Sequence, residues 1–300
     1  MQGKFEYENR ATCICGWPLK DAVDEIGKTS AWGTVRFVRC ARCQSWCQSP
    51  YISPKSLAAW YDSDDYQGSA RVRGSVYANY LEDESHRIAE ARRRYRRDLS
   101  AHLPPSGGWV LEIGCATGSL LSVIRDAGYE VAGIDLSRRF ADAAKQLHGL
   151  EVQVADILSA KIPDGSFDMV LLFGTLSNLS DIPISLQRIY GLLKPGGVLV
   201  ANYPAADSIV AKLYGERFWM FAPSASTFMT SMGCGLALKQ AGFSSVESGL
   251  DRQMPSFRKL FTHAKCHVLL PVLDAFGLGN KSLPFRLPVP GVRIVRAARG

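Results

Sequence analysis

The chain has 300 residues, of which 47% are hydrophobic and 21% charged, with a formal net charge of +7. This composition is typical of a globular protein and suits one large domain, or one domain with a small module. Residues 1–10 are polar and charged, so we expect no secretory signal. The longest apolar stretch, 268–278, contains Pro271 and Asp274 and is too short to cross a bilayer. We therefore expect a cytoplasmic protein without a membrane span.

The N-terminal segment 1–55 is dominated by cysteines, spaced CxC at its start and CxxC near its end. Clustered cysteines in a cytosolic chain indicate a metal before disulfides. The segment 31–39 between them alternates as a strand does. Two cysteine pairs on tight turns joined by a hairpin describe a zinc ribbon, in which four thiolates surround one Zn²⁺. The predicted ligands are Cys13, Cys15, Cys40 and Cys43.

Two alternatives to this ligand set stay open. Cys47 could take the place of Cys13 or Cys15, or the segment could be a metal-free hairpin with incidental thiols. We expect a structural rather than a catalytic zinc, because a catalytic site usually has a His or carboxylate ligand and the chain has no His before His86. So short a segment buries little core, so the metal would supply much of its folding energy.

Residues 56–108 are predicted to be a helical connector. A short helix at 54–61 is followed by a polar loop at 62–74 and a helical pattern at 75–99. This last pattern carries the most basic run of the chain, which could contact nucleic acid or form an ordinary solvated face. The arginines predicted to share one face are Arg92, Arg93, Arg96 and Arg97.

From residue 109 onward, short apolar segments alternate with helical patterns, which predicts parallel strands joined by crossover helices. The predicted strands are 110–113, 130–135, 152–156, 167–172, 193–202, 246–250 and 291–296. The first strand turns through Gly114, Ala116 and Gly118 into a helix, so the backbone can approach a ligand closely. The second ends at Asp135, where an acid suits the hydroxyls of a ribose.

ExGxxxG from Glu112, a strand ending in Asp135, then VAD, FDMV and LLKPGG follow in this order. The combination resembles the class I S-adenosylmethionine (SAM)-dependent methyltransferases over about residues 75–299. The resemblance implies an α/β, Rossmann-like seven-stranded fold whose last strand is antiparallel and inserts between the fifth and sixth. The cysteine segment resembles the small zinc-binding domain that precedes many bacterial methyltransferases, and the catalytic domain would span 109–300.

The resemblance also implies a cofactor site. Asp135 would accept from the ribose hydroxyls, and Asp156 from the adenine amino group, although helix capping is an alternative role for Asp156. Ala116 stands where many members have Gly, and we expect the extra methyl to be tolerated. A tyrosine of the connector would reach the methionine end. The predicted SAM-binding residues are Tyr80, Glu112, Gly114, Cys115, Ala116, Gly118, Asp135, Leu136, Asp156, Ile157 and Phe173.

The implied activity is methyl transfer to O, C or N of a small molecule such as a secondary metabolite, sugar or quinone. An insertion at about 205–230 suits an apolar or ring-containing acceptor, and a second at 252–288 could complete a lid or a homodimer contact. The aromatic residues of the first insertion are Tyr214, Phe218, Trp219, Phe221 and Phe228. One alternative is an RNA methyltransferase that uses the zinc module and the arginine helix. Another is a SAM-binding regulatory protein without catalysis. No residue is assigned as catalytic base.

Overall fold

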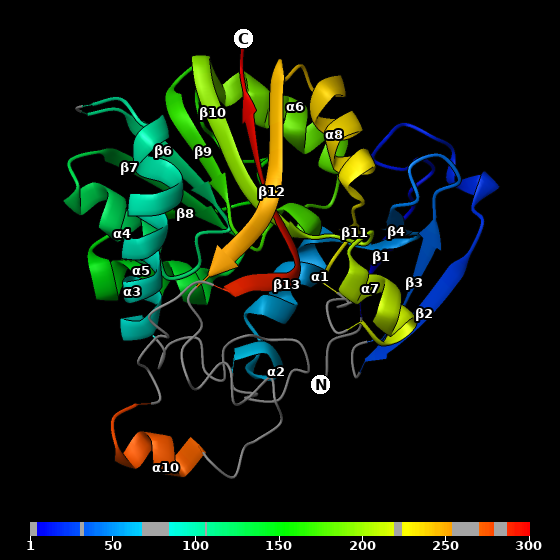
Figure 1. The fold of residues 1–300 in the computed structure, drawn as a ribbon, viewed down its shortest axis with the longest axis horizontal. Helices are drawn as coiled ribbons and strands as arrows, with labels where there is room; N and C mark the ends of the chain where they lie inside the picture. Colours follow the sequence, from blue (N-terminus) through cyan, green and yellow to red (C-terminus); the bar gives the residue numbers. More distant parts are fainter. Residues whose placement is uncertain are drawn as a thin grey trace.

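The computed structural model describes residues 5–30, 33–67, 84–105, 107–218, 224–253, 270–278 and 287–300. Its centre is a seven-stranded sheet in the order β12-β13-β10-β9-β6-β7-β8 (Figure 1). The parallel strands are β6 (Trp109–Ile113), β7 (Glu130–Asp135), β8 (Val152–Val154), β9 (Phe167–Leu172) and β10 (Leu193–Pro204). The antiparallel β13 (Leu287–Ala298) lies between β10 and β12 (Ser245–Gln253). The predicted Rossmann-like fold is confirmed, including the insertion of the last strand.

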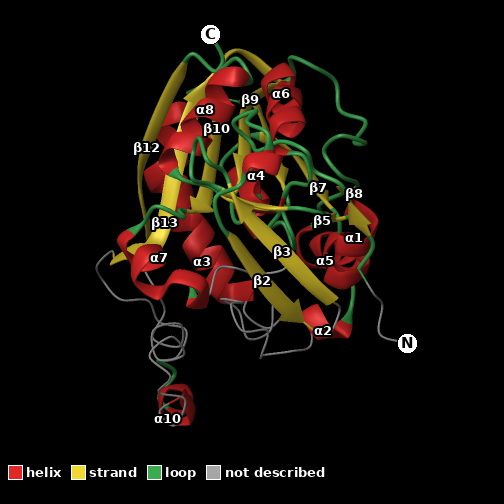
Figure 2. Ribbon diagram, turned by 90° about the vertical axis from the view of Figure 1, so that its right-hand side faces the viewer, coloured by secondary structure: helices red, strands yellow, loops and turns green. Residues whose placement is uncertain are grey.

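Helices cover both faces of this sheet (Figures 1 and 2). One face carries α3 (Glu84–Arg94), α4 (Ser119–Asp126) and α5 (Arg138–His148), and the other α6 (Ile182–Leu192) and α8 (Ser231–Gln240). Successive side chains of a strand point to opposite faces. In β6, Val110 therefore packs with Ile124 of α4, whereas Leu111 packs in the core that contains Leu186 of α6.

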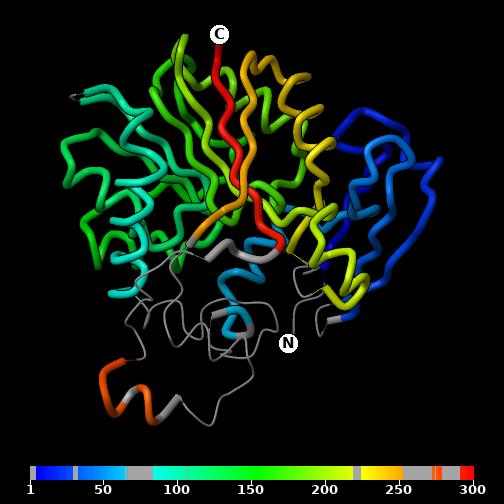
Figure 3. The backbone as a smooth tube through the Cα atoms, in the orientation of Figure 1, coloured from blue at the N-terminus to red at the C-terminus, as the bar shows by residue number. Residues whose placement is uncertain are grey.

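The cysteine segment forms a second sheet, in the order β11-β4-β3-β2. Its own strands are β2 (Glu25–Ser30), β3 (Gly33–Arg39) and β4 (Trp46–Gln48), and β11 (Thr227–Phe228) comes from the first predicted insertion. Two further strands, β1 (Tyr7–Glu8) and β5 (Tyr51–Ile52), pair antiparallel. In Figure 3 the blue N-terminal part and the yellow-green part of the chain lie side by side. The N-terminal segment thus shares a sheet with the rest of the protein.

Two aromatic residues of the first insertion, Phe218 and Phe228, pack in a buried cluster with residues of the N-terminal sheet. Phe228 is completely buried, with its ring edge-on to Phe37 of β3 at 5.6 Å between centroids. Phe218 is buried in the same cluster, while Tyr214 is exposed at the end of α7 (Ile209–Tyr214). These rings pack on the N-terminal sheet because burying large apolar surface there stabilises its attachment. Trp219 and Phe221 lie outside the described residues.

The connector contains α1 (Pro54–Tyr61), α2 (Asp64–Gln67) and α3, which continues into a π-helical turn, Tyr95–Leu99. The predicted loop at 62–74 therefore starts with a helical turn, in which the Tyr66 amide donates to the Ser63 hydroxyl. The remaining elements are 3₁₀ turns at Leu19–Asp21, Ser100–His102, Leu176–Asn178 and Gly215–Arg217, and helix α10 (Leu270–Ala275). No helix in the described ranges is both long and apolar enough to cross a membrane.

The arginine run is less exposed than the sequence predicts. Arg94 is buried, and Arg97 donates twice to the Asp98 carboxylate and is largely buried with it. Arg92 and Arg96 are the exposed members. The face of α3 formed by Arg87, Ala91 and Arg94 points inward, because α3 packs on α4 and the sheet. The basic face is therefore narrower than the predicted one.

Candidate cofactor and zinc sites

The Asp135 carboxylate lies where β6 turns into α4. One of its oxygens accepts from the Ala116 amide at 2.8 Å and the other from the Ser137 amide at 2.9 Å. The side chain is 8% exposed. Burial raises the pKa of Asp135 to about 6 despite these two hydrogen bonds. The second strand's acid is thus held against the glycine-rich turn with its carboxylate fixed in orientation.

The small residues of this turn differ in what their backbone conformation and surroundings require. Gly114 has φ +71, and a Cβ there would collide with the Thr175 side chain. Gly118 has φ +75 and caps α4, and its Cβ would lie 2.7 Å from Leu150. At these two positions, protein atoms occupy the space that we expected to be left for the cofactor. Ala116 has φ +48, so its methyl group costs backbone strain as well as space.

Glu112 is the buried acid of the motif, at 5% exposure. Burial first and the nearby Asp135 second raise its pKa to about 8. Among the described residues, its Oε2 has no hydrogen-bond partner. In the turn after the neighbouring strand β9, no atom of the described residues lies within 4 Å of a Cβ built on Gly174, so a ligand could approach that backbone. An unsatisfied buried acceptor beside open space fits the ammonium group of SAM.

The other predicted residues are divided between this turn and its surroundings. Cys115 is buried beside Asp135, and burial raises the pKa of its thiol. Leu136 is half-buried and, like Tyr61 and Tyr66, packs against the cluster that contains Trp60. Phe173 is half-buried at the end of β9. The structure therefore brings the β6, β7 and β9 residues to one edge of the sheet.

Asp156 and Ile157 follow β8. The Asp156 carboxylate accepts from the Leu158 amide at 2.9 Å within a turn, and no helix begins at this position. Burial raises the pKa of this carboxyl. Ile157 is 1% exposed and belongs to the core under α6. Tyr80 lies outside the described residues.

Sequence reasoning missed two acids that bind this edge. Asp62 of the connector accepts from the Ser137 hydroxyl at 2.5 Å and from the Arg139 amide at 3.2 Å. Glu84 at the start of α3 accepts from Ser119 at 2.6 Å and from Thr117 at 3.0 Å, both in the turn itself. No local pattern identifies either acid, because each meets its partner only through the tertiary fold.

The four predicted zinc ligands converge. All four sulfur atoms lie within 4.8 Å of one another, and all four side chains are buried. The Cys13 and Cys43 sulfurs are 3.4 Å apart, and those of Cys15 and Cys40 are 3.7 Å apart. Four sulfurs at ideal bond lengths around a tetrahedral Zn²⁺ would be about 3.8 Å apart. The donor set and its spacing therefore fit one zinc ion.

The turns around this cluster differ in their residues but share a conformation. Gly16 follows the first cysteine pair with φ +77, and Gln44 follows the second with φ +61. The Gln44 side chain donates to the Ala41 carbonyl at 2.9 Å, which offsets part of the cost of this left-handed backbone. The Cys47 thiol donates to the Cys13 sulfur at 3.6 Å and lies beside the four-sulfur group.

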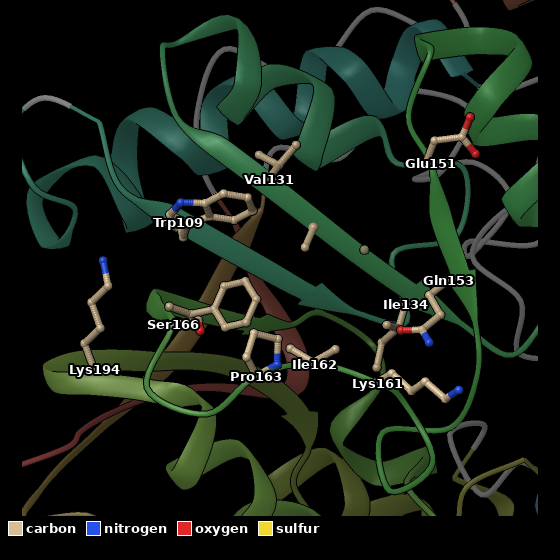
Figure 4. A pocket seen from close by; sticks show the side chains of 13 residues that line it. Trp109, Val131, Ile134, Glu151, Gln153, Lys161, Ile162, Pro163, Ser166 and Lys194 are labelled. Atoms are coloured by element: carbon tan, nitrogen blue, oxygen red, sulfur yellow. The ribbon is translucent and has the colours of Figure 1, made fainter.

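A separate cavity of about 650 Å³ lies against the sheet (Figure 4). It opens between the amino ends of β6 and β9, beside Trp109 and Phe167, and extends along β7 to Gln153. The β8–β9 connection contains no helix, so part of this face is covered by loop residues such as Pro163. None of the predicted SAM-binding residues lines it. This cavity is thus distinct from the carboxyl-end site.

The family assignment follows from residues 81–248, which match the family model described as a methyltransferase domain. The chain belongs to this family. It is a class I SAM-dependent methyltransferase with a seven-stranded Rossmann-like fold. The family match begins after the cysteine segment and ends before β13. The fold of these two parts is known from the structure alone.

The methyltransferase is similar to several curated enzymes. It is 31% identical over 176 residues to malonyl-[acyl-carrier protein] O-methyltransferase of Enterobacter lignolyticus, which covers 58% of this chain and 68% of that enzyme. It is 34% identical over 148 residues to ubiquinone biosynthesis O-methyltransferase of Xanthomonas axonopodis pv. citri, covering 47% and 54%. The matches thus span about half to two thirds of these relatives.

Solved structures agree on the fold. A SAM-dependent methyltransferase from Thermotoga maritima aligns with a TM-score of 0.51 and 17% identity, over 74% of this chain and 93% of that one. Phosphoethanolamine N-methyltransferase 2 of Haemonchus contortus, solved with SAM, aligns with a TM-score of 0.52 and 16% identity, over 91% and 71%.

Proposed function

We propose that this methyltransferase acts on a small-molecule acceptor, and that its cofactor lies at the carboxyl ends of β6, β7 and β9. The single observation that carries the site is the pair Glu112 and Asp135, two buried acids near the carboxyl ends of neighbouring strands. The acceptor class is supported by relatives whose names specify malonyl-[acyl-carrier protein], ubiquinone and demethylmenaquinone chemistry. Residues 1–55, 56–108 and 109–300 would act as zinc module, connector and catalytic domain.

The proposed roles follow from the donors and acceptors present. Bound SAM supplies a methyl group that its sulfonium makes electrophilic. Asp135, oriented by the Ala116 and Ser137 amides, accepts from the ribose hydroxyls. Glu112 accepts from the cofactor's ammonium group through its unsatisfied oxygen. Holding donor and acceptor in line in this way can lower the barrier by roughly 7–11 kcal/mol.

Fewer contacts within the protein support the residues that we propose for binding the adenine ring. Leu136 offers an apolar surface for the ring, and the Asp156 oxygen that does not accept from the Leu158 amide can accept from the adenine amino group. Phe173 would exclude water from the methionine end. These roles leave O-, C- and N-methylation equally compatible with the cofactor site.

Methyl transfer is tested with SAM that carries a labelled methyl group, the purified protein and an extract of the host cell. Label in the solvent-extractable small-molecule fraction is the expected result, and Asp135→Ala should abolish most of it at limiting SAM. Nuclease-sensitive label in the precipitate would instead show that the protein is an RNA methyltransferase. Binding of SAM without any transfer would establish a regulatory protein.

We also propose that Cys13, Cys15, Cys40 and Cys43 hold one structural zinc ion. The proposal is supported by four buried sulfurs at the spacing of a tetrahedral site. A closed set of four thiolates leaves no position for a substrate, which is typical of a structural metal. Protein purified without chelator should contain about one zinc per chain, and a folded sample without zinc would contradict the assignment.

A further inference from the structure

Three neighbouring strands end with a change of residue type on the face covered by α3. Along this face Val110, Leu171 and Val200 are completely buried and apolar. Two positions further on, in the same phase of the strand, come Glu112, Phe173 and Asn202. The apolar layer under α3 thus gives way to polar and aromatic groups at the edge where the cofactor is proposed to bind.

Arg94, the last residue of α3, lies over this edge. It is 7% exposed, and its guanidinium carbon lies 4.1 Å from the centroid of the Phe173 ring. Its two terminal nitrogens lie 3.4 and 3.2 Å from the two carboxylate oxygens of Asp251. The charge of Arg94 also counteracts part of the rise in the pKa of Glu112, which burial causes first.

Asp251 is 1% exposed, and its strand β12 changes register against β13 between Leu250 and Arg252. Such an irregularity redirects a side chain, and here the acid reaches Arg94 and Asn202. Burying a guanidinium and a carboxylate is costly unless each is paired. Arg94 also lies 3.8 Å from the Asp98 carboxylate, so it has a second acid nearby.

Asn202 of β10 connects this ion pair to the main chain. Its amide nitrogen donates to the Asp251 carboxylate at 2.9 Å, and its amide oxygen accepts from the Gly174 backbone N–H at 2.6 Å. Gly174 has φ +73, and no atom of the part of the chain that the structure describes lies within 4 Å of where its Cβ would be. A continuous set of contacts thus runs from α3 to the turn after β9.

We propose that Arg94, Asp251 and Asn202 are positioning residues that fix the Phe173–Gly174 turn against the methyl-donor end of the cofactor. The proposal rests on the cofactor site proposed above. Arg94 supports the Phe173 ring, and Asn202 fixes the Gly174 amide. None of the three touches the transferred methyl group. A displacement of this turn misaligns donor and acceptor, to which the rate of transfer is sensitive.

The test uses Asn202→Ala, which removes the acceptor for the Gly174 amide. Its matched control is Asp168→Ala at the opposite end of β9, because Asp168 likewise accepts from a backbone N–H, that of Trp109, at 2.8 Å. Both variants should lower the melting temperature. We expect Asn202→Ala alone to weaken binding of S-adenosylhomocysteine, measured by calorimetry, by about tenfold or more.

Substitutions of Arg94 test the contributions of its charge and of its side-chain volume. Arg94→Lys should bind S-adenosylhomocysteine with an affinity between those of the wild type and Arg94→Met. If Arg94→Met does not fold because it removes the positive charge that faces the buried Asp251, Arg94→Met with Asp251→Asn removes both charges. That double variant should fold and still bind weakly, since the support of Phe173 is absent.

The outcomes separate the two proposals. If the wild type fails to bind S-adenosylhomocysteine, the proposed cofactor site is wrong. If the wild type binds and Asn202→Ala binds equally tightly, or weakens no more than Asp168→Ala, the cofactor site stands and the positioning proposal is overturned.

Discussion

The hydroxyl of Thr230 donates a hydrogen bond to the carbonyl oxygen of Cys43 at 2.6 Å, across 187 residues of sequence. The same hydroxyl accepts from the Gly233 amide at 3.0 Å and so caps α8. The first turn of α8 thus lies against the second cysteine pair, where the partial positive charge of a helix N-terminus favours thiolates. The cysteine cluster and the catalytic domain are joined at this threonine.

Thr230→Val should loosen this junction while keeping the side-chain shape. Loss of the helix cap and of the bond to Cys43 should lower the free energy of unfolding by about 1–3 kcal/mol, measured by urea denaturation. We also expect faster loss of zinc to a chelator. Ser208→Ala is the control, since it removes the cap of α7 and should cost about 1 kcal/mol without changing zinc release.

Cys47→Ser should keep its zinc, whereas Cys40→Ser should lose it. The Cys47 sulfur contacts that of Cys13, while Cys40 belongs to the group of four converging sulfurs. A serine hydroxyl can still donate to Cys13. Metal content per folded chain is the measurement. Equal loss of zinc in the two variants would make Cys47 a ligand in place of one of the predicted four.

Ala116→Gly should stabilise the unliganded protein. The φ of +48 at this position is disfavoured for alanine and free for glycine, so we expect a gain of about 0.5–1 kcal/mol in unfolding free energy. Ala127, at the end of α4, has an ordinary φ of −87. Ala127→Gly should therefore have the opposite sign. A loss of stability in both variants would show that the strain at Ala116 is small.

The raised pKa of Glu112 predicts that the stability of the protein depends on pH. Its pKa in the folded protein is raised to about 8 from its ordinary value of 4.5, mainly by burial. Its contribution is therefore fully present below about pH 4.5 and is lost as the pH rises through about 8. Between pH 5 and 8 the unfolding free energy should fall by up to about 3 kcal/mol from this group. Glu112→Gln should flatten the profile, and Glu151→Gln, at an exposed position, should leave it unchanged.

The central fold could be predicted because its signals are local. Each core strand is a short apolar run bounded by a glycine or an acid, and the helices between them start at side-chain caps such as Ser137 and Asp181. Strand order followed from the family resemblance. The sequence did not show where Phe228 of the aromatic insertion lies, because nothing local indicates that its ring packs on Phe37 instead of facing a ligand.

The candidate site could be predicted only for the residues that stand at strand ends. Asp135 and Glu112 stand at strand ends, so their place at one edge follows from parallel pairing. The partners Asp62, Glu84 and Asp251 could not be chosen from the sequence, since each meets the site across 33 or more residues. One signal was present for Arg94: its i, i+3 spacing from buried Ala91 places it on the inner face of α3.

The strand β11, which completes the N-terminal sheet, constrains the order of events during synthesis. Thr230 leaves the ribosome 187 residues after Cys43, a delay of roughly 10–40 s at ordinary elongation rates. For that time the cysteines are already made, while the strand edge and the helix that cover them do not yet exist. A metal captured early would hold the nascent segment together until its partner strand arrives.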